Sequence, residues 1–361
     1  MSTSQPITEA LTIGGADANV TLLQRIIRTQ AFRIFLVLMG IVAIFIFLAP
    51  DTFGQWSNYR LIIQNASILA VLGVGMTFVI ITAGIDLSIG SVLVFSGVVS
   101  AMTMRSIGGE GWGVAAVGIA AAILSGLAWG TLNGVLIAKA KIPPLIVTLG
   151  SLGMALGLAL IITEGINIRE VPKVLTDNIG YGNVFGSIPI ISVIALAVVL
   201  LGVYLLNFTK FGLYTFAVGS SEISARRVGV NVDAQLIKVY ALAGGLAGFA
   251  GLLSLAQFST TAIAGQSQTN LNVIAGVVIG GTSLFGGIGT IFGTVVGLFI
   301  PAVLQNGFVI TGVQPFWQQV AVGAVLIIAV YIDQARRAAA MRGSKQSLWR
   351  KLVSGVKKSD D

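Results

Sequence analysis

The chain contains neither cysteine nor histidine in its 361 residues. Without thiols it can form no disulfide framework and has no cysteine nucleophile. Without either residue type, the usual ligand sets for zinc and haem cannot be assembled. The sequence also has no phosphate-binding glycine loop with a lysine, and neither a Ser/His/Asp nor a paired-carboxylate arrangement of the kind that catalyses hydrolysis. We therefore expect a chain that is not an enzyme and leaves any ATP hydrolysis to another chain.

Charge is also scarce. Only 9% of the residues are charged, whereas 55% are hydrophobic, and a soluble protein carries about 25% charged residues. Apolar runs long enough to cross about 30 Å of hydrocarbon recur along the whole length. A transmembrane barrel would instead alternate in segments of about ten residues. The composition predicts an all-α fold, a polytopic transmembrane helical bundle.

Ten apolar windows predict about ten crossings. They lie near residues 32–50, 61–82, 88–104, 113–138, 145–163, 188–206, 236–257, 271–284, 289–310 and 315–333. The eighth window is short and rich in glycine, which is typical of a broken or re-entrant helix. We expect a transmembrane domain over 31–335, between a cytoplasmic N-terminal segment, 1–30, and a basic cytoplasmic tail, 336–361.

Lysine and arginine fall mainly on one side of these crossings. If the N-terminus is cytoplasmic, only four of the 21 basic residues fall on the opposite side of the membrane. These four are Arg60, Arg105, Arg169 and Lys173. Because loops rich in lysine and arginine stay inside, this distribution predicts that both termini are cytoplasmic. It also explains the net charge of +8 without a nucleic-acid partner.

One acid, Asp86, lies in the stretch TAGIDLSIGS, within a run from 61 to 104 that has no other charged residue. An ionised carboxylate at bilayer depth costs about 2.5–3.5 kcal/mol. Asp86 and Ser88 suit the N-terminus of the following helix, in a turn made permissive by Gly84 and Gly90. The alternative is direct contact with a solute or an ion, and the two roles can coincide.

Two sets of glycines at helical spacing predict close packing of helices, either within one subunit or at a dimer seam. They are Gly126, Gly130 and Gly134, and Gly289, Gly293 and Gly297. A weak internal echo between GIDLSIG at 84–90 and GTSLFGG at 281–287 hints at a repeated half.

Two loops are long, 164–187 on the outer side and 207–235 on the inner side. In the inner loop, Ser220 or Ser221 can cap a short helix that runs to Arg226 or Arg227 and ends at Gly229. The pattern leaves two interpretations open, a solvated connector or a peg for another protein.

Several of these segments together resemble the permease subunits of bacterial ABC importers for ribose and related monosaccharides. The resemblance extends from about residue 35 to 333. The matching stretches are GMTFVIITAGIDLSIGSV at 75–92, Asn133 and Gly134, KIPPLIVTLG at 141–150, VGVNV at 228–232, NVIAGVVIGGTSLFGGIGT at 272–290 and PFWQQV at 315–320.

This resemblance implies a permease of the bacterial inner membrane that works as a homodimer or with a related chain. A periplasmic sugar-binding protein would deliver the solute. An ATPase with two fused nucleotide-binding domains would bind ATP and magnesium, so that this chain holds no cofactor. The family's coupling segment implies ATPase-coupling roles for Gly219, Ser221, Glu222, Ala225, Arg226 and Gly229, although Arg227-Val228-Gly229 departs from the usual Leu-Ser-Gly.

The expected function is alternating access for a neutral monosaccharide or related polyol. A sugar requires hydroxyl and amide partners and no counter-ion, which fits the scarcity of buried charge. The candidate path residues, chosen for polarity at membrane depth, are Thr82, Asp86, Ser88, Asn133, Thr148, Thr282 and Ser283. The rival hypothesis is an ion-coupled secondary transporter that acts alone, with Asp86 as its coupling residue.

Overall fold

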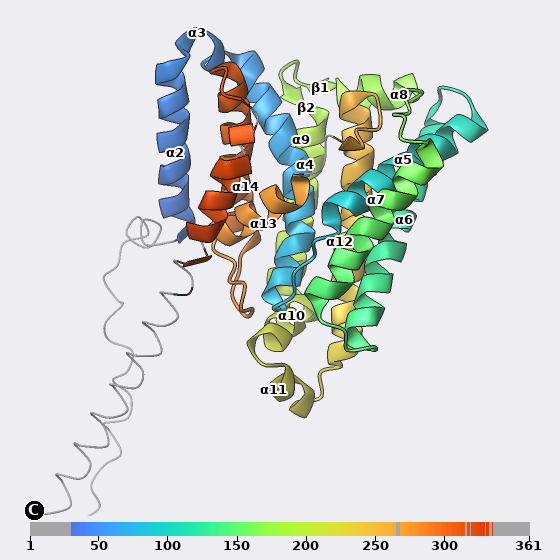
Figure 1. Cartoon of the computed structure of the whole chain (residues 1–361), viewed down its shortest axis with the longest axis vertical. Coiled ribbons are helices and arrows are strands. Elements are labelled where there is room, and N and C mark those ends of the chain that lie inside the picture. The colour runs from blue at the N-terminus through green and yellow to red at the C-terminus, as the bar shows by residue number, and fades with distance from the viewer. Residues whose placement is uncertain are drawn as a thin grey trace, which may run out of the picture.

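The fold is a bundle of helices with one short β-hairpin (Figure 1). The computed structural model describes residues 30–264, 268–314, 316–317, 319–328, 330–331 and 334. Nearly all of the predicted N-terminal segment, 1–30, and the whole predicted tail, 336–361, lie outside these residues.

Eight described helices are long and apolar enough to cross a membrane. They are α2 (Gln30–Leu48), α4 (Trp56–Ile81), α5 (Ile89–Ile107), α6 (Trp112–Ala138), α7 (Pro144–Thr163), α9 (Ile190–Phe208), α12 (Val232–Phe258) and α14 (Ile291–Ile310). Two shorter apolar helices are α13 (Thr269–Ile279) and Gln319–Ile328. In chain order these helices follow the ten predicted crossings, so the all-α polytopic fold is confirmed.

The short α13 confirms the prediction that the eighth apolar segment is interrupted. Its 11 residues span only about 16 Å, roughly half of the hydrocarbon core. Gly281, Gly286 and Gly287 then take positive φ in the loop that follows, a backbone region that favours glycine. Thr290 caps α14 by accepting a hydrogen bond from the N–H of Gly293.

Helices α4 and α12 form the centre of the bundle. In their apolar windows, 83% and 78% of the residues are buried, against 17% in α2 and 22% in α9. Figure 1 shows α2 and α14 on one flank and α5, α6 and α7 on the other. The peripheral helices therefore supply the apolar surface that would face lipid.

Short elements gather at the two ends of the bundle (Figure 1). One end carries α3 (Pro50–Phe53), α8 (Lys173–Leu175), a π-helical turn (Thr176–Gly180) and the antiparallel strands β1 (Asn183–Val184) and β2 (Ile188–Pro189). The other end carries α10 (Lys210–Ser220) and α11 (Glu222–Arg227). The two long predicted loops thus lie at opposite ends of the molecule.

Close helix packing depends on glycine at the contact between α6 and α12. A Cβ at Gly126 would overlap the carbonyl oxygen of Gly244, and one at Gly130 would overlap that of Tyr240. The first glycine set therefore packs within the subunit. In the second set, Gly293 and Gly297 of α14 likewise lie against the backbone of α13 and the turn that follows it. The prediction that Gly289 belongs to the same helix is wrong, because α14 begins at Ile291.

Candidate functional site

The lone acid lies in the segment 82–88, which connects α4 to α5. Asp86 is 2% exposed. Its Oδ1 accepts hydrogen bonds from the N–H of Ser88, at 2.8 Å, and from the hydroxyl of Ser88, at 2.6 Å. A single carboxylate oxygen therefore satisfies two buried donors that water cannot reach.

A chain of buried hydrogen bonds leads to this carboxylate. The hydroxyl of Ser151 on α7 donates to Oδ1 of Asn133 on α6, at 2.5 Å. The Nδ2 of Asn133 donates to the Ser88 hydroxyl at 3.0 Å, and that hydroxyl donates to Asp86. Because an ionised carboxylate only accepts, it is the natural end of a chain in which every other member donates.

A second contact ties α7 to the same segment. The hydroxyl of Thr148 donates to the carbonyl oxygen of Ile85 at 3.2 Å. The structure thus brings together Asp86, Ser88, Asn133 and Thr148, four of the predicted path residues. They meet as a packed polar network between α6, α7 and the segment 82–88, and their contact with a solute stays a prediction.

The N-terminus of α5 differs in detail from the cap that the sequence suggested. Asp86 lies before the helix as expected, but it bonds to Ser88, the residue at the cap position, and Ser88 makes no side-chain cap of its own. The N–H of Gly90 in the first turn donates to Oδ1 of Asn270 on α13, at 2.5 Å. Sequence reasoning missed Asn270, since nothing local links it to a helix 180 residues earlier.

Thr282 and Ser283 lie in the loop between α13 and α14. Both are buried, at 1% and 3% exposure. The loop packs on the end of α4, because the N–H of Gly287 donates to the carbonyl oxygen of Ile81 at 2.9 Å. A Cβ at Gly286 would also meet Ala83, so this loop lies against the end of α4 and the start of the segment 82–88.

A pocket of about 420 Å³ opens at the end of the bundle that carries α11. Thr82 lines it, together with Tyr240 of α12, whose hydroxyl is buried without a hydrogen-bond partner among the described residues. Lys141 and Glu222 lie at the same pocket, and they come from the α6–α7 linker and from α11. The start of the segment 82–88 therefore lines this pocket.

The short helix predicted in the inner loop is present as α11. The hydroxyl of Ser221 caps it by accepting from the N–H of Ser224 at 3.2 Å. Gly229 takes a φ of +87° just after the helix, as a helix-terminating glycine does. The capping serine, the helix and the terminating glycine are thus confirmed.

The predicted coupling residues do not all face outward. Ala225 is 3% exposed, and Gly219 packs so tightly against the carbonyl of Ile81 that a Cβ would overlap it. The large exposed apolar side chains near α11 are Ile223, at 68%, and Val228, at 78%. Sequence reasoning missed these two, although exposed apolar residues on a short polar helix are a usable signal for contact with a partner.

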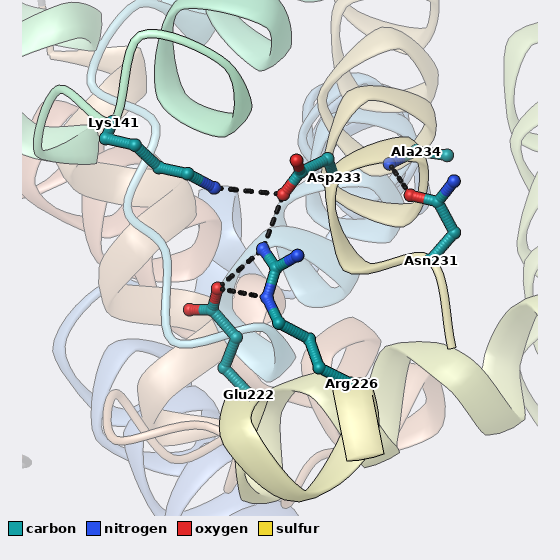
Figure 2. Close-up of polar contacts among 6 residues, drawn as sticks. All are labelled: Lys141, Glu222, Arg226, Asn231, Asp233 and Ala234. Atoms are coloured by element: carbon teal, nitrogen blue, oxygen red, sulfur yellow. Dashed lines mark hydrogen bonds and ion pairs between the residues drawn. The ribbon is translucent and has the colours of Figure 1, made fainter. Parts of the chain in front are cut away.

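Glu222 and Arg226 belong to an ion network that faces α12 and the α6–α7 linker (Figure 2). Arg226 pairs with Glu222 at 2.9 Å and with Asp233 at 2.5 Å, and Lys141 pairs with Asp233 at 2.9 Å. The hydrogen bonds to Asp233 and to Glu222 raise the pKa of Arg226 above its ordinary value. Asn231 caps α12 beside the network by accepting from the N–H of Ala234.

Comparison with known proteins shows which family the chain belongs to. The family described as branched-chain amino acid transport system / permease component matches residues 58–330. The chain belongs to this permease family. The match covers the Asp86 segment, the ion network and the loop between α13 and α14.

Individual relatives of the permease cover nearly its whole length. It is 36% identical to the ribose import permease protein of Escherichia coli (strain K12), over 83% of this chain and 92% of that one. It is 31% identical to the fructose import permease protein of Rhizobium meliloti, over 84% and 85%. It is 33% identical to the D-allose transport system permease protein of E. coli (strain K12), over 83% and 90%. No solved structure gives a significant match.

Proposed function

We propose that the permease forms the membrane path of an ATP-driven, binding-protein-dependent importer for a monosaccharide or related polyol. The observation that carries this proposal is its similarity to permeases for ribose, fructose and D-allose over more than four-fifths of its length. These three solutes are all small, neutral and rich in hydroxyl groups. We therefore propose a small, neutral, hydroxyl-rich solute for this permease.

The distribution of charge inside the bundle supports a neutral solute. Among the residues that the structure describes, Asp86 is the buried side chain that can carry a charge. Other buried polar groups are hydroxyls and amides, which can exchange hydrogen bonds with a sugar without a counter-ion. The proposed path residues remain Thr82, Asp86, Ser88, Asn133, Thr148, Thr282 and Ser283.

The energy would come from a partner subunit. We expect an ATPase with two fused nucleotide-binding domains, which binds ATP and magnesium and contacts α11. The exposed Ile223 and Val228 support this contact, because a short capped helix at the end of a bundle presents them to the surroundings. The conversion of ATP binding into alternating access would then begin at α11.

The other partners follow from the two ends of the molecule. With α11 in the cytoplasm, α8 and the β-hairpin lie on the periplasmic side, where a loaded sugar-binding protein would dock on 164–187. A second copy of this chain, or a related chain, would complete the path. Both termini would then be cytoplasmic in a bacterial inner membrane, as the distribution of basic residues indicates.

Uptake by proteoliposomes tests this function. The permease is reconstituted with the ATPase and the binding protein encoded beside it, and uptake of labelled pentoses, hexoses and polyols is measured with and without ATP. We expect uptake that requires all three components and is inhibited by vanadate. Uptake by the permease alone that collapses with a proton or sodium ionophore would refute the importer and favour ion coupling through Asp86.

A further inference from the structure

Lys141 connects the linker between α6 and α7 to α12. It takes a φ of +57°, an unusual conformation for a residue other than glycine. Its Nζ lies 2.9 Å from Oδ1 of Asp233, in the first turn of α12. The linker backbone thus directs a lysine toward the start of a helix that is 92 positions away in sequence.

The same oxygen of Asp233 also accepts a hydrogen bond from Arg226 on α11 (Figure 2). Three separate elements, α11, α12 and the α6–α7 linker, therefore meet at one carboxylate oxygen. Arg226 is held on its other side by Glu222 of the same helix. A displacement of α11 would change the position of Arg226 and with it the geometry of the Asp233–Lys141 pair.

The linker continues into the part of α7 that contacts the Asp86 segment. Lys141 is followed by Ile142 and two prolines, and α7 begins at Pro144. The linker is stiff, because each proline fixes φ. Within the first turns of α7, Thr148 bonds to the carbonyl of Ile85 and Ser151 bonds to Asn133. A movement at Lys141 would therefore reach the segment 82–88 through the first turns of α7.

We propose that Lys141 and Asp233 are positioning residues that transmit the movement of α11 to α7 and so to the segment around Asp86. This inference rests on the proposed ATP-driven function. The pair is partly exposed, with side-chain exposures of 58% and 24%, and such pairs add little to folding stability. Its role is therefore to fix how α11 and α7 lie relative to each other during the transport cycle.

The first test measures solute transported per ATP hydrolysed in proteoliposomes. Lys141→Ala and Asp233→Asn should each lower this ratio by about two- to fivefold, the range expected from loss of one partly exposed ion pair. The ATPase rate and co-purification with the ATPase should stay unchanged. In the double variant, Lys141→Ala with Asp233→Asn, the ratio should fall no further than in Asp233→Asn alone. Lys141→Arg keeps the charge and should retain the wild-type ratio.

The matched control is Lys139→Ala, in an exposed lysine at the end of α6 that forms no ion pair with the described residues. This variant should behave as the wild type. A wild-type ratio in Lys141→Ala would overturn the inference, and so would losses that multiply in the double variant. If the wild-type complex itself shows no ATP-driven uptake, the proposed function fails, and the inference fails with it.

A second measurement uses the absence of native cysteine. Ile142→Cys places a single thiol at the pocket beside Lys141, and its rate of labelling by a water-soluble maleimide is measured in the assembled complex with and without ATP. We expect ATP to change this rate, and we expect Asp233→Asn to remove the change. A response to ATP of the same size with and without Asp233 would contradict transmission through this pair.

Discussion

Replacement of Asp86 separates its structural role from a role as an ion carrier. In Asp86→Ala, the buried N–H and hydroxyl of Ser88 both lose their acceptor. A buried donor left unsatisfied costs about 1–3 kcal/mol, so the two together predict about 2–6 kcal/mol of destabilisation. This is a large part of the roughly 5–15 kcal/mol that holds a typical domain folded.

Asp86→Asn should behave differently, because Asn keeps an oxygen at the Oδ1 position. The two hydrogen bonds become neutral and weaken by about 1 kcal/mol each. Against this, the variant removes a buried carboxylate whose ionised form costs about 2.5–3.5 kcal/mol at bilayer depth. We therefore expect Asp86→Asn to fold almost as well as the wild type and to keep most of its transport activity.

Two assays check this pair of variants. Thermal unfolding in detergent, followed by tryptophan fluorescence, should show a large decrease of the midpoint for Asp86→Ala and a small one for Asp86→Asn. Uptake in proteoliposomes should follow the same order. Asp51→Ala, which removes an exposed acid in α3, serves as the control for loss of charge alone. The reasoning is refuted if Asp86→Asn folds and assembles normally but has lost all uptake.

Three further predictions concern packing, partner contact and the cap on α5. Gly130→Ala should destabilise the protein by about 1–3 kcal/mol in thermal unfolding, because its Cβ meets the α12 backbone, whereas Gly157→Ala in α7 meets open space and should not. Ile223→Glu should prevent co-purification with the ATPase and leave the unfolding midpoint unchanged, since this side chain is 68% exposed. Asn270→Ala leaves the N–H of Gly90 without its acceptor and should cost about 1–3 kcal/mol.

The features that the sequence predicted correctly are those set by neighbouring residues. Hydropathy is summed over one continuous segment, so the long crossings and the short α13 could be read directly from the chain. The helix α11 was predictable for the same reason, because Ser221 and Gly229 act on backbone groups within a few positions. The helical assignment of Gly289 was wrong because Thr290 caps α14 one residue later.

The contacts of the site were only partly predictable. Polarity at membrane depth identified Ser88 and Asn133, but it could not indicate that they bond to each other or that Ser151 completes the chain. Lys141 and Asp233 looked like ordinary charges at the ends of two helices. Their contact depends on how α6 and α12 pack through glycine, which no local pattern determines.

The hydrogen-bond arithmetic of the segment 82–88 explains why one acid lies in an otherwise uncharged region. Serine and asparagine side chains both donate and accept hydrogen bonds. In a row of such side chains, each one that accepts a bond still has a donor of its own that needs an acceptor. Where no water is present, such a hydrogen-bond chain must end on a group that only accepts. The backbone N–H of Ser88 is a second buried donor at the same place. The carboxylate of Asp86 meets both donors with one oxygen. This requirement is the same for every sugar, so we expect Asp86 to fix how α5, α6 and α7 meet, and its contact with a solute stays a separate prediction.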